Sequence, residues 1–143
     1  MTEYKTEAIT LKTYDFNDYD KIVVLYSKNK GLIRAVAKGV KRQKSLIGVR
    51  IQPINFVDVI LKKGKNLDTV QQADFIETFK PIKKDLQKIT LACFFAEMVF
   101  VFALEDDPNS QKIFELLLHT FQNLEKASSD ETLYKLLVTF EYK

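Results

Sequence analysis

Nine basic residues and no acidic residue lie between Asp20 and Asp58, and such a stretch is suited to binding anions. A field of one sign attracts phosphate groups, acidic peptides or anionic lipids. Gly39 and Gly48 lie within it, and glycine permits close approach of a backbone to a ligand. The candidate phosphate-binding residues are Lys21, Arg34, Lys38, Lys41, Arg42, Lys44 and Arg50.

The same charges are also typical of a solvated edge strand, where Lys and Arg prevent aggregation through the edge. The basic excess belongs to the first part of the chain, because residues 1–80 carry 15 Lys and Arg against 9 Asp and Glu. Residues 81–143 carry 7 against 10. We favour anion binding, since Arg34 and Lys38 fall on one strand face, the remaining bases follow in the next loop, and no acid is present to neutralise them.

Aromatic residues flank the basic stretch and offer a second kind of chemistry, the stacking of bases on rings. In YDFNDYD, residues 14–20, Phe16 and Tyr19 are candidates for stacking, with core filling as the equal alternative. Core filling is the expected role of Phe56, Phe75 and Phe79.

Catalytic and metal chemistry have little support. The chain has one Cys and one His, so it offers no disulfide, no zinc site and no cofactor site that we recognise. Cys93 lies in an apolar run and is expected in the core, while His119 is expected to be structural. No phosphate-cradling Gly-Lys-Ser/Thr loop is present. We therefore expect a binding protein and not an enzyme.

Five apolar segments with the alternation or continuity of strands position these residues. They are Glu7–Thr13, Ile22–Tyr26, Leu32–Lys38, Ile54–Leu61 and Leu67–Phe79. In the third segment Ile33, Ala35 and Ala37 share one face. Five short strands separated by turns predict a small barrel or sandwich, and such barrels bind nucleic acid with a strand face and adjoining loops.

After Pro81 the apolar period changes to that of helices. We expect one helix over 82–104, a second that begins at Asp107 and Pro108, and a third from Ser128. The run from Ile89 to Leu104 has 16 residues and contains Glu97, whereas a membrane span needs about 20 residues. We expect a bundle helix buried on most sides; the alternative is that part of it faces a missing segment or a partner. The N-terminus lacks a signal peptide, so the cytoplasm is the expected compartment.

The motifs of residues 4–80 resemble the bacterial recombination-repair mediator family RecO. The pattern consists of Asp20-Lys21-Ile22, Gly31, Ala37-Lys38-Gly39, Lys41-Arg42, Ser45, Gly48 and Gln52-Pro53. The resemblance implies an α+β chain, with an N-terminal five-stranded OB-fold barrel over residues 1–80 and a helical domain over residues 81–143.

The resemblance also implies function. It implies binding of single- and double-stranded DNA, annealing of complementary strands, and a nucleoid-associated place in the cytoplasm. It implies partnership with RecR, contact with the C-terminal tail of single-stranded DNA-binding protein, and help in loading RecA. By motif, the family's DNA contacts fall on Lys38, Lys41, Arg42 and Lys44, with Arg34 upstream. The alternatives left open are an OB-fold module for acidic peptides and an OB-fold RNA binder.

Two departures from the family are visible. Many relatives carry a four-cysteine zinc site further along, and this chain, with its single cysteine, lacks the ligands for it. The helical domain is expected to be truncated, which leaves the tail-binding pocket of the family without assigned residues here.

Overall fold

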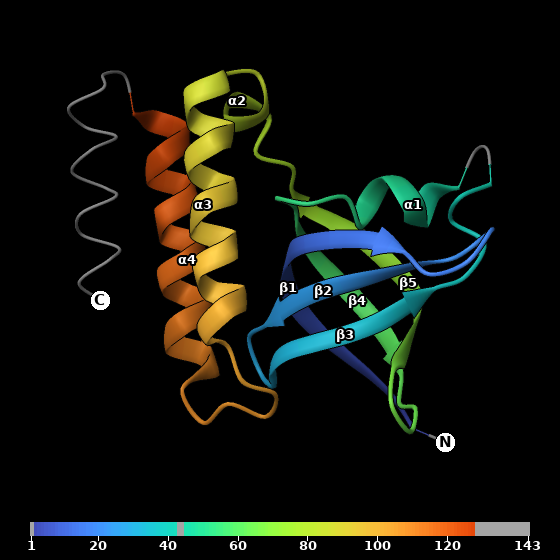
Figure 1. Ribbon diagram of the computed structural model, residues 1–143. Coiled ribbons are helices and arrows are strands. Elements are labelled where there is room, and N and C mark those ends of the chain that lie inside the picture. The colour runs from blue at the N-terminus through green and yellow to red at the C-terminus, as the bar shows by residue number, and fades with distance from the viewer. Residues whose placement is uncertain (1, 43–44, 128–143) are drawn as a thin grey trace.

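The computed structural model describes residues 2–42 and 45–127, and Figure 1 shows a barrel of strands beside two long helices. The strands are β1 (Glu3–Asp15), β2 (Lys21–Ser27), β3 (Gly31–Ala37), β4 (Phe56–Lys62) and β5 (Asp68–Glu77). The helices are α1 (Leu46–Arg50), α2 (Lys80–Lys83), α3 (Leu86–Phe102) and α4 (Ser110–Lys126). The five expected strands, followed by helices, are confirmed.

The strands form a closed barrel in the order β1-β2-β3-β5-β4. The long strand β1 closes it, because β1 pairs antiparallel with β2 on one side and with β4 on the other. Among the described strands, only β3 and β5 pair in parallel, through Ala35 with Asp68 and Val36 with Thr69. This strand order is that of an OB-fold, so the predicted fold class is confirmed.

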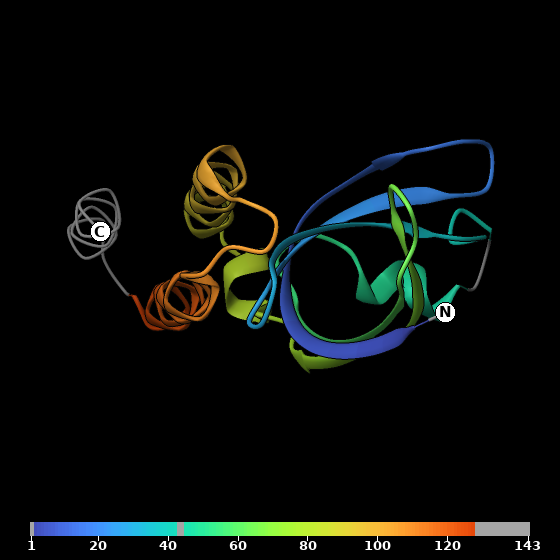
Figure 2. The same ribbon diagram turned by 90° about the horizontal axis from the view of Figure 1, so that it is seen from below.

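Alternation along the strands separates two apolar cores. Ile33, Ala35 and Ala37 point into the barrel, as predicted, where they join the core with Val23 and Leu25. Val24 and Tyr26 of β2 and Leu32 of β3 point outward and pack against the long helices, which stand on one side of the ring in Figure 2. This second core contains Val24, Tyr26, Leu32, Phe95, Phe114 and Phe121.

Gly31 joins the barrel to the helices. Its φ is +76°, and a Cβ there would lie 2.7 Å from the carbonyl oxygen of Leu104. The next amide, that of Leu32, donates to the same carbonyl at 3.1 Å. The Tyr26 hydroxyl donates to the carboxylate of Asp107, which lies with Leu104 in the loop after α3, at 3.4 Å. Burial of this hydroxyl raises the pKa of Tyr26. Both the backbone conformation and the close approach therefore require glycine.

The predicted helix boundaries need two corrections. The helix expected over 82–104 is two helices, because α2 ends at Lys83 and Asp85 caps α3 by accepting from the amides of Gln87 and Lys88. The helix expected to begin at Asp107 begins at Ser110. The Asp107 carboxylate accepts instead from the amide of Asn109 at 2.8 Å, so it stabilises the turn before the helix.

The expectation that α3 is buried on most sides is wrong. Its main contacts are with strand β1 of the barrel and with the helices α2 and α4. Its side chains Leu86, Val101 and Phe102 are exposed by 81%, 62% and 79%. No helix in the described part of the chain is long and apolar enough to cross a membrane. The third expected helix, from Ser128, lies outside the described residues, and the division into domains 1–80 and 81–143 stays a prediction.

Candidate nucleic-acid interface

Two turns at the same end of the barrel are tied together by hydrogen bonds. One follows β1, at residues 16–20, and the other follows β3, at residues 38–42. The Asp20 carboxylate accepts from the Gly39 amide at 2.8 Å, and the Lys41 amide donates to the Tyr19 carbonyl at 3.0 Å. Gly39 has φ of +71°, which reverses the chain after β3. The basic turn therefore has a defined position against the aromatic one.

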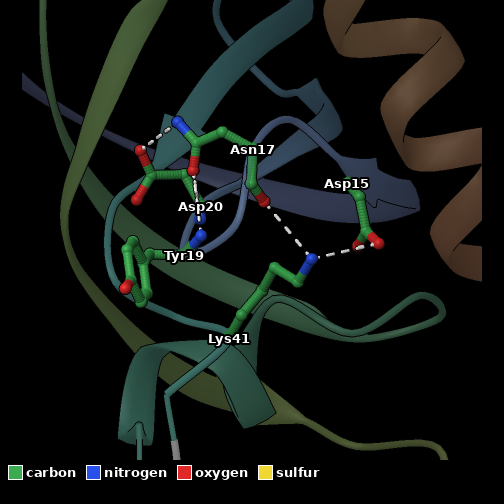
Figure 3. A network of polar contacts seen from close by, with 5 residues as sticks. All are labelled: Asp15, Asn17, Tyr19, Asp20 and Lys41. Carbon is green, nitrogen blue, oxygen red and sulfur yellow. Dashed lines mark hydrogen bonds and ion pairs between the residues drawn. The ribbon is translucent and has the colours of Figure 1, made fainter.

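Asn17 organises the aromatic turn. Its side-chain oxygen accepts from the amides of Tyr19 and Asp20, at 3.0 and 2.9 Å, and its nitrogen donates to Asp20 at 2.9 Å (Figure 3). The Gly39 amide and then the Asn17 side chain hold the pKa of Asp20 below its usual value. The positive charges of Lys38 and Arg42 lower the pKa of Asp20 further.

A surface hollow of about 430 Å³ lies beside these turns, and we call it the basic groove. Its lining residues are Asp15, Lys21, Val40, Lys41, Arg42, Ser45, Gly48, Val49 and Gln52. The structure thus brings together three of the predicted site residues, which come from β2 and from the turn after β3. Phosphate oxygens fit such a convergence of cations.

A short helix, α1, forms one wall of the groove where the sequence predicts only a loop. Ser45 caps it by accepting from the Gly48 amide at 3.0 Å. A Cβ at Gly48 would lie 2.9 Å from the Val40 carbonyl oxygen. The absence of a side chain at Gly48 therefore lets α1 approach the backbone at Val40, and close approach of a ligand at Gly48 stays a prediction.

The expectation that no acid neutralises the basic stretch is wrong. Lys41 pairs with Asp15 of β1 at 3.2 Å and also donates to the Asn17 carbonyl at 3.2 Å (Figure 3). Arg50 lies in α1, where its guanidinium donates to the Ala73 carbonyl at 2.9 Å and contacts Asp74 at 3.4 Å. These acids belong to other strands, so their proximity is invisible in a count along the sequence.

Arg34 lies apart from the basic groove. It is exposed on the outer face of β3, as predicted, but its guanidinium lies 5.6 Å from the Phe100 ring of α3. Lys12 lies over the same ring at 3.6 Å. Lys38 is exposed just beyond β3, nearer the groove. Lys44 lies outside the described residues.

The exposed aromatic residues lie next to the basic groove. Phe16 and Tyr19 are exposed by 52% and 56%, so both can be reached by a base. The Arg42 guanidinium lies 4.9 Å from the Tyr19 ring, which is a cation–π contact. Phe56 and Phe79 are buried, as predicted. Phe75 is 42% exposed, so the expectation that it fills the core is wrong.

Reactive side chains do not gather at a site within the described chain. Cys93 is exposed on α3 and not in the core as expected; partial burial still raises its pKa. His119 is exposed on α4. Among residues 2–42 and 45–127 no three His, Cys, Asp or Glu side chains lie close enough to hold a metal ion.

A second hollow, of about 110 Å³, has basic residues that the sequence analysis missed. Lys30, Lys63 and Lys65 line it together with Arg34. The signal in the sequence is the turn Lys63-Gly64-Lys65, which follows the fourth predicted strand. Nothing along the sequence indicates that this turn and Lys30 lie together.

The chain is similar in sequence to known proteins. A family model described as "Recombination protein O N terminal" matches residues 1–79. The "DNA repair protein RecO" of Clostridium novyi is 32% identical over 143 residues, which cover 100% of this chain and 55% of the relative. The protein of that name in Acetivibrio thermocellus is 34% identical over 143 residues, which cover 100% of this chain and 56% of that relative. The chain therefore spans about half the length of these relatives.

Proposed function

The chain belongs to the RecO family of DNA repair proteins, and from this we propose that it acts in DNA repair and recombination by binding DNA through the basic groove. The observation that carries the proposal is the convergence of Lys21, Lys41 and Arg42 on one hollow. It lies beside the exposed rings of Phe16 and Tyr19, and this combination of cations and rings suits single-stranded nucleic acid.

Each side chain has a distinct part in the proposed complex. Lys21, Lys41 and Arg42 bind phosphates, and Lys38 extends the contact along the neighbouring turn; Lys44 remains a phosphate contact proposed from the sequence alone. Lys41 exchanges its ion pair with Asp15 for a phosphate. The Tyr19 ring stacks on a base, and Arg42 above it binds the adjoining phosphate. We assign Arg50 a structural part, because Ala73 and Asp74 already hold its guanidinium.

Membership of the family supports finer proposals for the protein in the cell. A groove that binds phosphates without reading bases accepts any sequence, in single or double strands, and annealing of complementary strands requires this. We extend the proposal to cooperation with RecR, contact with the tail of single-stranded DNA-binding protein and assistance to RecA, in the cytoplasm and near the nucleoid. In all of these roles the chain binds and does not catalyse.

A salt titration tests the proposal. We compare two variants that each lose three charges from exposed or half-buried positions. The groove variant is Lys21→Gln, Lys41→Gln, Arg42→Gln, and the control is Lys84→Gln, Lys112→Gln, Lys126→Gln. Fluorescence anisotropy with labelled single-stranded DNA gives the slope of log affinity against log salt concentration. We expect the groove variant to lose about 2 units of slope, at about 0.7 for each phosphate contact, and the control to lose none. Equal slopes in a folded groove variant contradict the proposal.

Competition separates DNA binding from the two alternatives. Unlabelled single-stranded DNA should displace the labelled strand at lower concentration than single-stranded RNA or an acidic peptide of equal charge. Preferential displacement by RNA supports the RNA binder, and preferential displacement by the peptide supports the protein-interaction module.

A further inference from the structure

The second hollow lies on another side of the barrel from the basic groove. Figure 1 shows the turn between β4 and β5 below the barrel, whereas the turn after β1 is at its right-hand end. Lys63 and Lys65 come from the β4–β5 turn, Lys30 from the turn before β3, and Arg34 from β3 itself. Three separate elements thus present cations to one small hollow.

Within the described part of the chain these four cations form no ion pairs, in contrast to Lys41 of the basic groove, which pairs with Asp15. None of Lys30, Arg34, Lys63 and Lys65 forms an ion pair with a carboxylate among the described residues. Lys30 lies over the ring of Tyr4 at 4.1 Å, a contact that leaves the ammonium able to bind an anion. Lys63 and Lys65 are exposed. A phosphate can therefore bind here without first displacing a carboxylate from these lysines.

Acidic residues on the hollow determine how strongly it attracts anions. Asp68 accepts from the Tyr4 hydroxyl and from the Gly64 amide, so its charge is already stabilised by the protein. Glu105 and Asp106 line the hollow from the loop before α4 and oppose an anion. Four cations against three carboxylates leave a positive excess, which lies on the side of the β4–β5 turn.

Strand β3 connects the two hollows. Arg34 lines the second hollow and is exposed on the outer face of β3, and Lys38 follows on the same side beside the groove. Four residues of strand separate them by about 13 Å. OB-folds bind oligonucleotides across the face of strands 2 and 3, between the loops that follow strands 1 and 4. Here those loops are the aromatic turn and the turn with Lys63 and Lys65.

We propose that the hollow lined by Lys30, Arg34, Lys63 and Lys65 is a second phosphate-binding site, occupied by the same single strand that lies in the basic groove. The strand crosses the outer face of β3 past Lys38 and Arg34 and ends against the β4–β5 turn. This inference rests on the proposed function, because the strand must first bind in the groove.

Strand length provides the test. The variant Lys63→Gln, Lys65→Gln is compared with the control Lys84→Gln, Lys112→Gln, in which two exposed lysines of the helical part are changed. The probes are oligothymidylates of about 5 and about 20 nucleotides, because OB-folds cover about 4 to 16 nucleotides. For the long probe we expect the variant to lose about 1.4 units of the salt slope and the control none. For the short probe, which fits in the groove alone, neither should change. Equal slopes for variant and control with the long probe overturn the inference.

A change of opposite sign provides a second test. Glu105→Gln, Asp106→Asn removes the two opposing carboxylates, and Asn tolerates the φ of 52° found at Asp106. We expect this variant to bind the long probe more tightly than the unchanged protein and the short probe equally. Unchanged affinity for the long probe overturns the inference, since a phosphate in the hollow must sense these charges.

The failure of the inference differs from the failure of the proposed function. If the unchanged protein binds neither probe at low salt, the basic groove is not a DNA site and both proposals fail. The other outcome is that the unchanged protein binds both probes. If the variant Lys63→Gln, Lys65→Gln then keeps the same difference in salt slope between the long and the short probe, only the second site fails.

Discussion

The Asp20 carboxylate accepts a hydrogen bond from the Gly39 amide at 2.8 Å, and this contact joins the turn after β1 to the turn after β3. Both residues belong to motifs that we recognised along the sequence, Asp20-Lys21-Ile22 and Ala37-Lys38-Gly39. The structure explains their co-occurrence, because the acid of one motif holds the glycine of the other.

Replacing Asp20 by Asn should weaken DNA binding, although it removes a negative charge from a basic surface. The amide has one acceptor oxygen in place of the two that bind Gly39 and Asn17, so one of these contacts is lost and the connection between the two turns is weakened. The measurements are DNA affinity and hydrogen exchange at the amides of Gly39 and Lys41, and we expect faster exchange. Tighter binding by the variant would show that the charge of Asp20 matters more than its hydrogen bonds.

The same carboxylate predicts a dependence of stability on pH. The pKa of Asp20 is lower in the folded protein than its unfolded value of about 3.9. Its stabilising contribution is therefore present above that value and lost as the pH falls through the lowered pKa. We expect the difference in melting temperature between the unchanged protein and Asp20→Asn to shrink below pH 4. A difference that stays constant from pH 6 to pH 2 contradicts this account.

Two glycines with positive φ should respond differently to alanine. A Cβ at Gly39 meets no atom within 4 Å, so Gly39→Ala costs only the conformation, about 1 to 2 kcal/mol. At Gly31 the Cβ would also lie 2.7 Å from the Leu104 carbonyl oxygen, so Gly31→Ala should cost more. Urea unfolding of both variants measures the order, and Gly39→Asn is the matched control because Asn tolerates this conformation. Equal costs would mean that the loop after α3 yields to the new methyl group.

Asp15→Asn should increase DNA affinity about twofold. The change releases Lys41 from an ion pair whose carboxylate is 66% exposed, and such pairs contribute about 0.5 kcal/mol. Lys5 and Asp58 form a similar exposed pair away from the groove, so Asp58→Asn is the control and should leave affinity unchanged. The same increase in both variants would point to net charge and not to Lys41.

Arg50→Met should lower stability and leave the salt dependence of DNA binding unaltered. The change keeps most of the apolar stem and removes the hydrogen bond to Ala73 and the contact with Asp74. Thermal unfolding and the salt slope are measured on the same sample. A loss of slope in a folded variant would restore Arg50 to the DNA-binding residues.

Local patterns predicted the fold well. The alternation of Ile33, Ala35 and Ala37 indicates which side of β3 faces the barrel core, because side chains alternate along any strand. Charge partners are not local, however. Asp74 is 24 residues from Arg50 in sequence, and only the closed barrel brings them together. Lys30 and Lys65 likewise meet through the strand order. The sequence therefore predicted the cations of the basic groove, but neither the lysines of the second hollow nor which cations are already paired.

The exposed position of Cys93 makes the direction of the bound strand measurable. It is the only thiol of the chain, and it lies on α3, which the contacts at Gly31 and Leu104 hold against the barrel. A single dye attached there is close to Phe100, the ring that Arg34 approaches from β3. Energy transfer from that dye to a label on the 5′ or the 3′ end of an oligonucleotide would then report the polarity of the strand along β3.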